Sequence, residues 1–283
     1  MKALVFDGSE AKVKKVDKPI LDKHFNVLIK VLYTGICKTD VYVSMGKLNS
    51  SKPIIMGHEF CGYVVDSKSE SFKKGDFVTC NPILENGKMM GVDYNGSFAE
   101  YVKAPSSSCY VFNGDNKKLA AYIEPLAAAM APIEDKEFLK DKEIAIVGKD
   151  RIGKLTESVF RHAGIEAHFI KEFKSDVFYD VIVESWADED ILDKCIDSLK
   201  TGGTLILKSR NYNKIPLDLY KIVRKNIKLE GMYYYKDYNK VINFANCFPE
   251  IKSFLGKSYS IDDWKLAFSD SENSYQKIFF RMF

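Results

Sequence analysis

The sequence predicts two domains of different class: an N-terminal barrel-like β domain and an α/β domain built on a doubly wound parallel sheet. Residues 1 to about 112 consist of short β-rich runs separated by Gly, Pro, Asn and Ser. After 113–116, apolar strands alternate with helical patterns. A chain of 283 residues is long enough for two domains that each bury a core.

The N-terminal domain is defined by β-rich runs, and helical periodicity is scarce between them. The runs cover 26–33, 62–65, 76–79 and 98–102. Many short strands with turn residues between them are typical of an all-β barrel.

The α/β domain begins with an Ala-rich, helix-prone segment at 119–131, and strands then alternate with helices. Continuous apolar runs such as 143–147 are typical of strands buried on both faces of a parallel sheet. We expect strands at 143–147, 166–170, 180–184, 203–207 and 227–232, and helices at 152–163 and 189–200. This alternation implies right-handed crossovers in a doubly wound sheet.

The last strand-like run, 275–281, belongs to a segment too short to form a domain. We expect it to return to the N-terminal β domain. The predicted domains are therefore 1–115, completed by 257–283, and 116–256.

Composition excludes several classes of protein. Lys and Arg exceed Asp and Glu by 42 − 39 = 3, and the charges are interspersed, so we expect neither nucleic acid nor membrane as a partner. No apolar run approaches the length of a membrane-spanning helix, and the start lacks the apolar core of a signal peptide. We expect a cytoplasmic protein.

The cysteines are scattered and form no CxxC pair, which argues against a disulfide scaffold and a zinc ribbon. Most of them fit the role of small buried hydrophobes. They are Cys37, Cys61, Cys80, Cys109, Cys195 and Cys247.

One cluster of ligand types stands out in the β domain. Cys37 lies in the run Gly35-Ile-Cys-Lys-Thr-Asp40, and His58 and Glu59 lie in Gly57-His-Glu-Phe-Cys-Gly62. Thiolate, imidazole and carboxylate hold zinc in catalytic sites that leave a position open. A Cys and a His twenty residues apart are, taken alone, more often coincidence than ligation; the surrounding glycines and acids favour a site.

These two runs and several others resemble the zinc-dependent branch of the medium-chain dehydrogenase/reductase superfamily, which includes alcohol, polyol and threonine dehydrogenases. The other motifs follow in the family's order: Lys74-Gly-Asp-Phe-Val78, Gly96-Ser-Phe-Ala-Glu-Tyr-Val102, Glu124-Pro-Leu-Ala127 and Gly202-Gly-Thr-Leu-Ile-Leu207. The resemblance implies a GroES-like β-barrel catalytic domain and a Rossmann domain.

By this resemblance, Cys37 and His58 are zinc ligands and Glu59 is the adjacent carboxylate that ligates or exchanges with water. Glu124 matches the acid that completes the coordination; the alternative is an exposed acid at a helix start before Pro125. The lobe of four cysteines that binds a second, structural zinc is missing, so we expect one zinc per chain.

The resemblance also assigns roles in proton transfer. Asp40 matches the acid that hydrogen-bonds a ligating histidine, and Thr39 matches the hydroxyl that takes the substrate proton. Tyr42 stands where many relatives have a histidine that continues the relay, so the relay runs through this phenol or through water. The implied reaction moves a hydride between a small alcohol, polyol or sugar derivative and NAD or NADP.

The phosphate-binding loop departs from the family pattern. In Val147-Gly-Lys-Asp-Arg-Ile-Gly153, glycines fill the first and third fingerprint places, but Asp150 fills the middle one and opposes an anion there. Lys149 and Arg151 could offset this charge. The expected cofactor-binding residues are Gly148, Lys149, Arg151, Ile152, Gly153 and Lys171.

Lys171 follows the second strand where NAD-specific relatives carry an acid, which favours a 2′-phosphate and NADP; the alternative is a solvated surface lysine. The interval 170–180 is shorter than the helix, strand and helix that relatives insert there, so the adenosine side of the cofactor cleft is truncated.

Relatives pair through a sheet edge in the Rossmann domain, and 232–235 is a candidate interface for a homodimer or homotetramer. The alternative function is a degenerate relative that keeps the zinc pocket but not dinucleotide binding.

Overall fold

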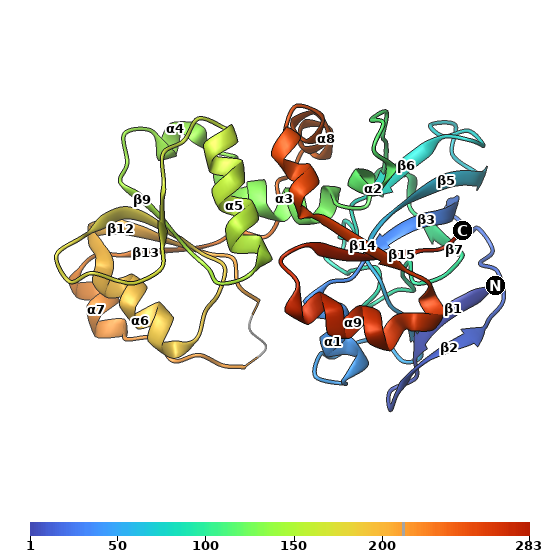
Figure 1. Cartoon of the computed structure of the whole chain (residues 1–283), viewed down its shortest axis with the longest axis horizontal. Coiled ribbons are helices and arrows are strands. Elements are labelled where there is room, and N and C mark those ends of the chain that lie inside the picture. Colours follow the sequence, from blue (N-terminus) through green and yellow to red (C-terminus); the bar gives the residue numbers. More distant parts are fainter. Residues whose placement is uncertain (211–212) are drawn as a thin grey trace. The chain divides into compact units, whose positions relative to one another are not determined.

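The computed structural model describes residues 1–210 and 213–283. The chain forms two compact units (Figure 1). Unit 1 consists of Met1–Pro125 and Tyr238–Phe283, and unit 2 consists of Leu126–Asp237.

Unit 1 is built on two sheets. The smaller has the order β2-β1-β4, and the larger has the order β14-β15-β3-β5-β6-β8, with β7 also paired to β3. The strands are β1 (Lys2–Phe6), β2 (Ala11–Lys15), β3 (Val27–Gly35), β4 (Ile54–Ile55), β5 (Glu59–Ser67), β6 (Phe77–Cys80), β7 (Tyr101–Ala104), β8 (Cys109–Val111), β14 (Leu255–Tyr259) and β15 (Lys277–Arg281).

The C-terminal strand returns to the β domain, as predicted. β15 pairs antiparallel with β3, with Phe279 opposite Gly35 and Arg281 opposite Tyr33. The aromatic run of β15 is buried because it lies inside the larger sheet rather than at its edge.

Helices of unit 1 are short and lie between its strands. They are α1 (Lys38–Ser44), α2 (Lys117–Ala120), α8 (Tyr238–Asn246) and α9 (Trp264–Asn273), with 3-10 turns η1 (Ser106–Ser108), η3 (Pro249–Phe254) and η4 (Ile261–Asp263). The sequence analysis missed α1, because its seven residues are too few to show a helical repeat.

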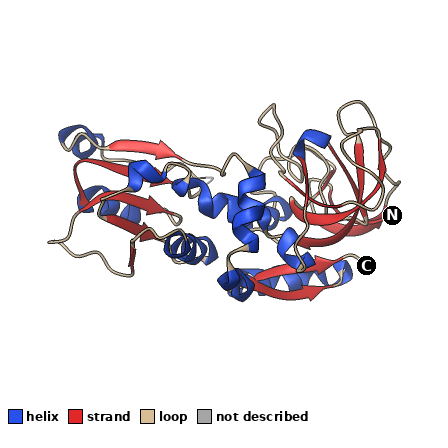
Figure 2. Cartoon of the chain, turned by 90° about the horizontal axis from the view of Figure 1, so that it is seen from above, coloured by secondary structure: helices blue, strands red, loops and turns tan. Residues whose placement is uncertain are grey.

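Unit 2 is a parallel sheet of order β10-β9-β11-β12-β13, which confirms the predicted doubly wound domain. Its strands are β9 (Ile144–Val147), β10 (His168–Ile170), β11 (Tyr179–Glu184), β12 (Leu199–Leu207) and β13 (Lys228–Gly231). Helix α4 (Lys136–Leu139) precedes β9, and helices α5 (Arg151–His162), α6 (Glu189–Ser198) and α7 (Leu219–Arg224) lie in the connections between strands (Figure 2).

The helix expected over 119–131 is interrupted. The chain forms α2, then a separate helix α3 (Ile123–Met130), then the 3-10 turn η2 (Ala131–Ile133). Proline has no N–H to donate and is tolerated only in a helix's first turn. Beginning α3 at Ile123 places Pro125 in that first turn, whereas one continuous helix would have placed it in the interior.

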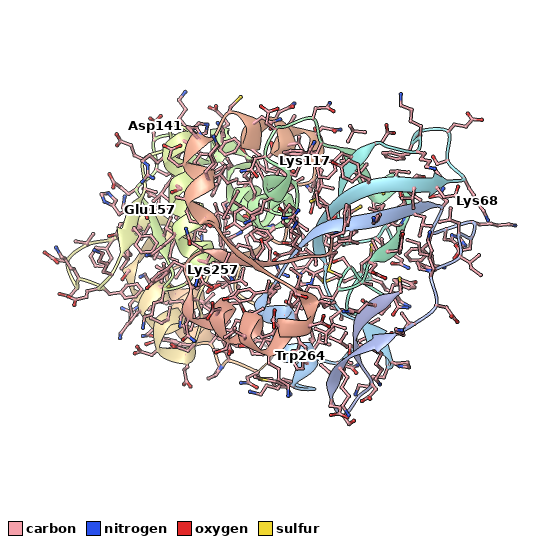
Figure 3. All side chains as sticks on the ribbon, turned by 45° about the vertical axis from the view of Figure 1, so that its right-hand side comes forward. Lys68, Lys117, Asp141, Glu157, Lys257 and Trp264 are labelled. Atoms are coloured by element: carbon pink, nitrogen blue, oxygen red, sulfur yellow. The ribbon has the colours of Figure 1, made fainter. Side chains whose placement is uncertain are left out.

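Aromatic packing holds α9 and β15 in the core of unit 1. The rings of Phe98 and Phe280 meet edge to face with centroids 5.0 Å apart, and Phe268 lies 6.2 Å from Phe98. Trp264, in the first turn of α9, packs its ring 5.4 Å from that of Phe268 (Figure 3). No helix in the described parts of the chain has the length and apolar character needed to cross a membrane.

We expect Phe280→Ala to lower the free energy of unfolding of unit 1 by about 3–5 kcal/mol, because the change leaves a cavity under α9. Urea unfolding followed by Trp264 fluorescence, in a Trp186→Phe background, measures this. Leu266→Ala, on the exposed side of the same helix, should change the value by no more than about 0.5 kcal/mol. Equal effects would show that Phe280 is not a core residue.

Candidate active site

The pairing of β3 with β5 brings the predicted metal ligands together. The strands run antiparallel with Gly35 opposite Glu59. Cys37 follows β3 as the N-terminal cap of α1, and His58 immediately precedes β5. One potential ligand atom from each of Cys37, His58 and Glu59 lies within 4.8 Å of the others.

Asp40 connects the two segments that carry these residues. Its Oδ2 accepts a hydrogen bond from the Cys37 backbone N–H at 2.9 Å, and its Oδ1 accepts one from the Gly57 N–H at 3.1 Å. Asp40 Oδ1 also lies 3.2 Å from His58 Nδ1. Asp40 and His58 are completely buried, so this carboxylate sets the position of the imidazole.

The charge around His58 favours its protonated form. Burial by itself would lower the pKa of His58, but the charges of Asp40 and Cys37 outweigh burial and raise that pKa well above its ordinary value. The pocket around the imidazole is therefore electronegative, which is the field that a cation requires.

Three polar atoms in this cluster are buried with no hydrogen-bond partner, both ring nitrogens of His58 and Glu59 Oε2. Buried polar atoms are nearly always satisfied, so such atoms call for an explanation. Together with Cys37 Sγ they are N, O and S donors of the types that zinc prefers. The residues present therefore fit a zinc ion.

A residue that the sequence analysis missed also enters the cluster. Lys277 of β15 is almost fully buried, and its Nζ lies 2.6 Å from Glu59 Oε1 and donates to the Ile36 carbonyl at 3.2 Å. The available signal was a single lysine beside the apolar run of the last strand. Lys277 neutralises Glu59 and holds one of its oxygens.

Two glycines make room for this arrangement. A Cβ on Gly35 would lie 2.3 Å from Glu59 Oε2. Gly57 has a φ of +92°, and a Cβ there would lie 2.3 Å from the Phe98 ring. Both positions therefore need glycine, Gly57 for its conformation as well as for space.

Three further predicted site residues of unit 1 lie on helices. Thr39 and Tyr42 lie on α1, Thr39 buried and Tyr42 half-buried, and the Lys38 ammonium lies 5.5 Å from the centroid of the Tyr42 ring. Glu124 is buried in the first turn of α3, not exposed, and is not a member of the Cys37, His58 and Glu59 group.

In unit 2 the predicted phosphate-binding loop joins β9 to α5. Gly148 and Gly153 are buried and pack closely, since a Cβ on Gly148 would lie 3.0 Å from the Gly153 Cα. Asp150 caps α5 by accepting a hydrogen bond from the Gly153 N–H at 3.0 Å. Arg151 and Ile152 begin α5, while Lys149 and Lys171 are exposed, Lys171 directly after β10.

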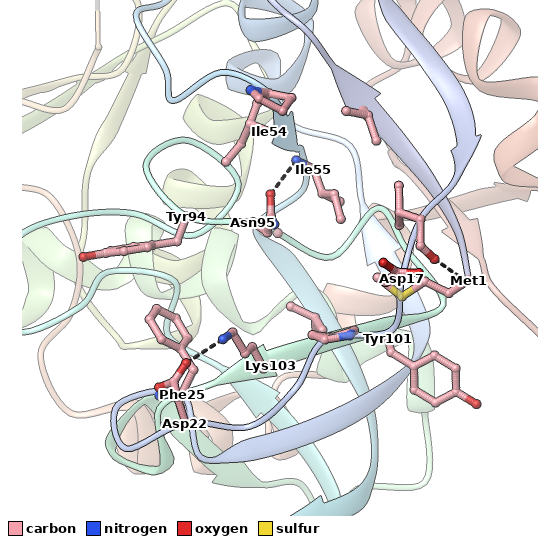
Figure 4. Close-up of a pocket in the computed structure, with 16 residues that line it drawn as sticks. Met1, Asp17, Asp22, Phe25, Ile54, Ile55, Tyr94, Asn95, Tyr101 and Lys103 are labelled. Carbon is pink, nitrogen blue, oxygen red and sulfur yellow. Dashed lines mark hydrogen bonds and ion pairs between the residues drawn. The ribbon is translucent and has the colours of Figure 1, made fainter.

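A cavity of about 500 Å³ lies elsewhere in unit 1 (Figure 4). Ile54, Ile55, Phe25 and Tyr94 contribute to its walls, and Lys103 forms an ion pair with Asp22 at its rim. None of the predicted metal ligands lines it. It is therefore separate from the metal-ligand cluster.

Comparisons with known proteins agree with this fold. Residues 23–113 match the family model of the alcohol dehydrogenase GroES-like domain. The L-threonine 3-dehydrogenase of Shewanella putrefaciens is 25% identical, with 95% of each chain covered.

Solved structures share the architecture over the whole chain. The 2R,3R-butanediol dehydrogenase of Bacillus subtilis has a TM-score of 0.85 at 20% identity and covers 100% of this chain and 99% of its own. A short chain alcohol dehydrogenase of Escherichia coli complexed with NADH has a TM-score of 0.88 at 15% identity, with 100% and 99% covered. This likeness confirms the fold.

The GroES-like unit and its dehydrogenase relatives define an oxidoreductase of the alcohol dehydrogenase type. These matches confirm the resemblance to the medium-chain dehydrogenase/reductase superfamily that the motifs carry.

We expect Lys277→Met to lower the free energy of unfolding of unit 1 by about 3–5 kcal/mol in metal-free protein, because it leaves the Glu59 carboxylate buried and unpaired. Adding Glu59→Gln removes that charge and should recover most of the loss. Urea unfolding after chelation measures both. If the double variant is no more stable than Lys277→Met, the cost does not come from the unpaired charge.

Proposed function

We propose that the chain is a zinc-dependent oxidoreductase that moves a hydride between a small alcohol, polyol or sugar derivative and NAD or NADP. The observation that carries this proposal is the buried group of Cys37, His58 and Glu59, whose donor atoms converge within 4.8 Å. Two of these residues have buried acceptor atoms without partners. The relatives are dehydrogenases, which supports a hydride-transfer reaction at this group of metal ligands.

Cys37 and His58 would hold the zinc, together with Glu59 or Glu124. The bound ion would supply Lewis acidity, which polarises a substrate oxygen and lowers the pKa of its hydroxyl. Asp40 Oδ1 lies 3.2 Å from His58 Nδ1, so a proton held on that nitrogen in the metal-bound protein would leave the lone pair of Nε2 available to the ion.

Other side chains prepare the site for proton transfer. Lys277 holds Glu59 Oε1 and leaves Oε2 available as a ligand or as an acceptor for water. The Thr39 hydroxyl receives the substrate proton. Tyr42, one turn further along α1, or a water molecule carries it onward.

The Gly148–Gly153 loop of unit 2 would hold the dinucleotide. Lys171, exposed directly after β10, tolerates a 2′-phosphate, which fits NADP as well as NAD. β13 lies at the end of its sheet with exposed residues, so a second copy could pair with it in a homodimer. All six cysteines are free thiols, which fits a reducing compartment.

We expect purified protein to contain about one zinc per chain, because one set of converging ligands is present and the four-cysteine lobe is absent. Cys37→Ala and His58→Ala should lose the metal. Cys109→Ala and Cys195→Ala, which change cysteines outside the ligand group, should retain it. Elemental analysis of the variants, with circular dichroism to confirm folding, measures this.

Two zinc ions per chain, or none after reconstitution with zinc, would contradict the proposal. Equal metal loss in all four variants would mean that the ligands are misassigned.

We expect Thr39→Val to lower kcat by about a hundredfold or more, with zinc content unchanged, because it removes a proton acceptor. Absorbance of NADH or NADPH, formed from a panel of secondary alcohols and polyols, measures the rate. Ser44→Ala is the matched control, since the Ser44 hydroxyl bonds only the Val41 carbonyl of the same helix. Wild-type rates in Thr39→Val would exclude the hydroxyl from the relay.

A further inference from the structure

Unit 2 gathers charged side chains at the carboxyl ends of three adjacent parallel strands. Asp150 lies three residues after the end of β9, Glu184 is the last residue of β11, and Lys208 is the first residue after β12. The backbone N–H of Lys208 donates to Glu184 Oε1 at 3.1 Å, and the charges of Glu184 and Asp150 both raise the pKa of Lys208. Sequence analysis assigned no role to Glu184 or Lys208.

These strand ends flank the position where a ligand binds in such sheets. β10 and β11 lie on opposite sides of β9, so the connection from β9 to β10 and the connection from β10 to β11 run in opposite directions across the sheet. Ligands bind outside the carboxyl ends of the strands at this switch point. Two acidic residues, Asp150 and Glu184, stand there, which is an unfavourable environment for the diphosphate of a dinucleotide.

Asp150 also uses a donor that a phosphate would need. The amides at a helix N-terminus bind phosphate in dinucleotide-binding loops. Here the Asp150 carboxylate accepts the Gly153 N–H, so this part of the anion site is filled by the chain itself. A diphosphate therefore needs another source of positive charge.

Lys208 supplies a positive charge at the same strand ends. Its Nζ donates to the Ala128 carbonyl. Glu184 Oε1 accepts the backbone N–H groups of Lys208 and Ser209 at 3.1 and 2.9 Å, while the buried Glu184 Oε2 has no hydrogen-bond partner. Glu184 is thus held by the backbone of the segment that carries the lysine.

We propose that Lys208 binds the diphosphate of the dinucleotide and that Asp150 competes with the diphosphate for this positive charge. The inference rests on the proposed function, because it assumes a dinucleotide in unit 2. It extends that function by naming a recognition residue outside the phosphate-binding loop and an internal competitor within it.

The charge of Lys208 changes near neutral pH. Burial and the nearby Arg210 lower the pKa of Lys208 to about 7, while Glu184 and Asp150 act in the opposite direction. The ammonium is therefore present below pH 7 and lost above it. Burial raises the pKa of Glu184, so its ionisation would also weaken anion binding as the pH rises, and the experiment must separate the two groups.

The experiment measures equilibrium dissociation constants of the full-length protein for NADH and NADPH by nicotinamide fluorescence, and for ADP-ribose by displacement. Lys208→Gln keeps an N–H donor for Ala128 and removes the charge. We expect it to raise all three constants about tenfold at pH 6.5 and to flatten their rise between pH 6 and 8.5.

Asp150→Asn preserves the helix cap and removes the competing charge. We expect it to lower the dissociation constants about three- to tenfold. In the Lys208→Gln background the decrease should be smaller, because the lysine charge for which Asp150 competes is absent.

Lys228→Gln is the matched control. It makes the same charge change on β13, at the amino end of the sheet, and should leave binding unchanged. Glu184→Gln keeps the acceptor for the two backbone N–H groups and should leave the pH dependence of binding in place.

Unchanged binding in Lys208→Gln, or equal weakening in Lys228→Gln, would overturn the inference and leave the proposed function standing. If the dissociation constants of Glu184→Gln no longer changed with pH, the pH dependence would belong to the Glu184 carboxyl group, and the role of Lys208 would be overturned. If Lys208→Gln weakened the binding of NADH but not that of ADP-ribose, the diphosphate would be excluded as the group that Lys208 contacts. No binding of any of the three by wild-type protein would overturn the proposed function as well.

Discussion

The Asp40 carboxylate joins the two chain segments on which the metal-ligand group depends. It accepts N–H groups from Cys37 and Gly57, residues that lie 20 positions apart, and it faces His58. Because these acceptors are buried, each hydrogen bond is strong and its loss would be costly. The pairing of β3 with β5 brings the segments near, and Asp40 then aligns the side chains.

Both units bury charge beside their proposed sites, and in both a lysine provides the compensation. In unit 1, Lys277 neutralises Glu59, while a second Glu59 oxygen remains without a partner. In unit 2, the charges of Glu184 and Asp150 favour the charged form of Lys208, and one Glu184 oxygen likewise has no partner. Buried unpaired oxygens are costly, and the Glu59 oxygen in unit 1 is of a type that binds a metal ion.

Local patterns predicted most of the fold because strands and turns leave signals within a few residues. The parallel strands of unit 2, from β9 to β13, were predicted from short strand-like runs that alternate with helical patterns. The return of the last strand to the β domain was also predicted, whereas its pairing with β3 was not. α1 was missed because two turns are too short to show periodicity, and the 119–131 helix was misjudged because Pro125 requires a helix start.

The sequence by itself determined the types of donor atom in the site, the order of the family motifs and the altered phosphate-binding loop, since these depend on residue identity and spacing. Tertiary structure alone decided that Glu59 meets Lys277, 218 positions away, and that the Lys208 backbone meets Glu184. It also decided that Asp150 caps α5. Such contacts depend on strand register and on burial, and neither is written in the local pattern of residues.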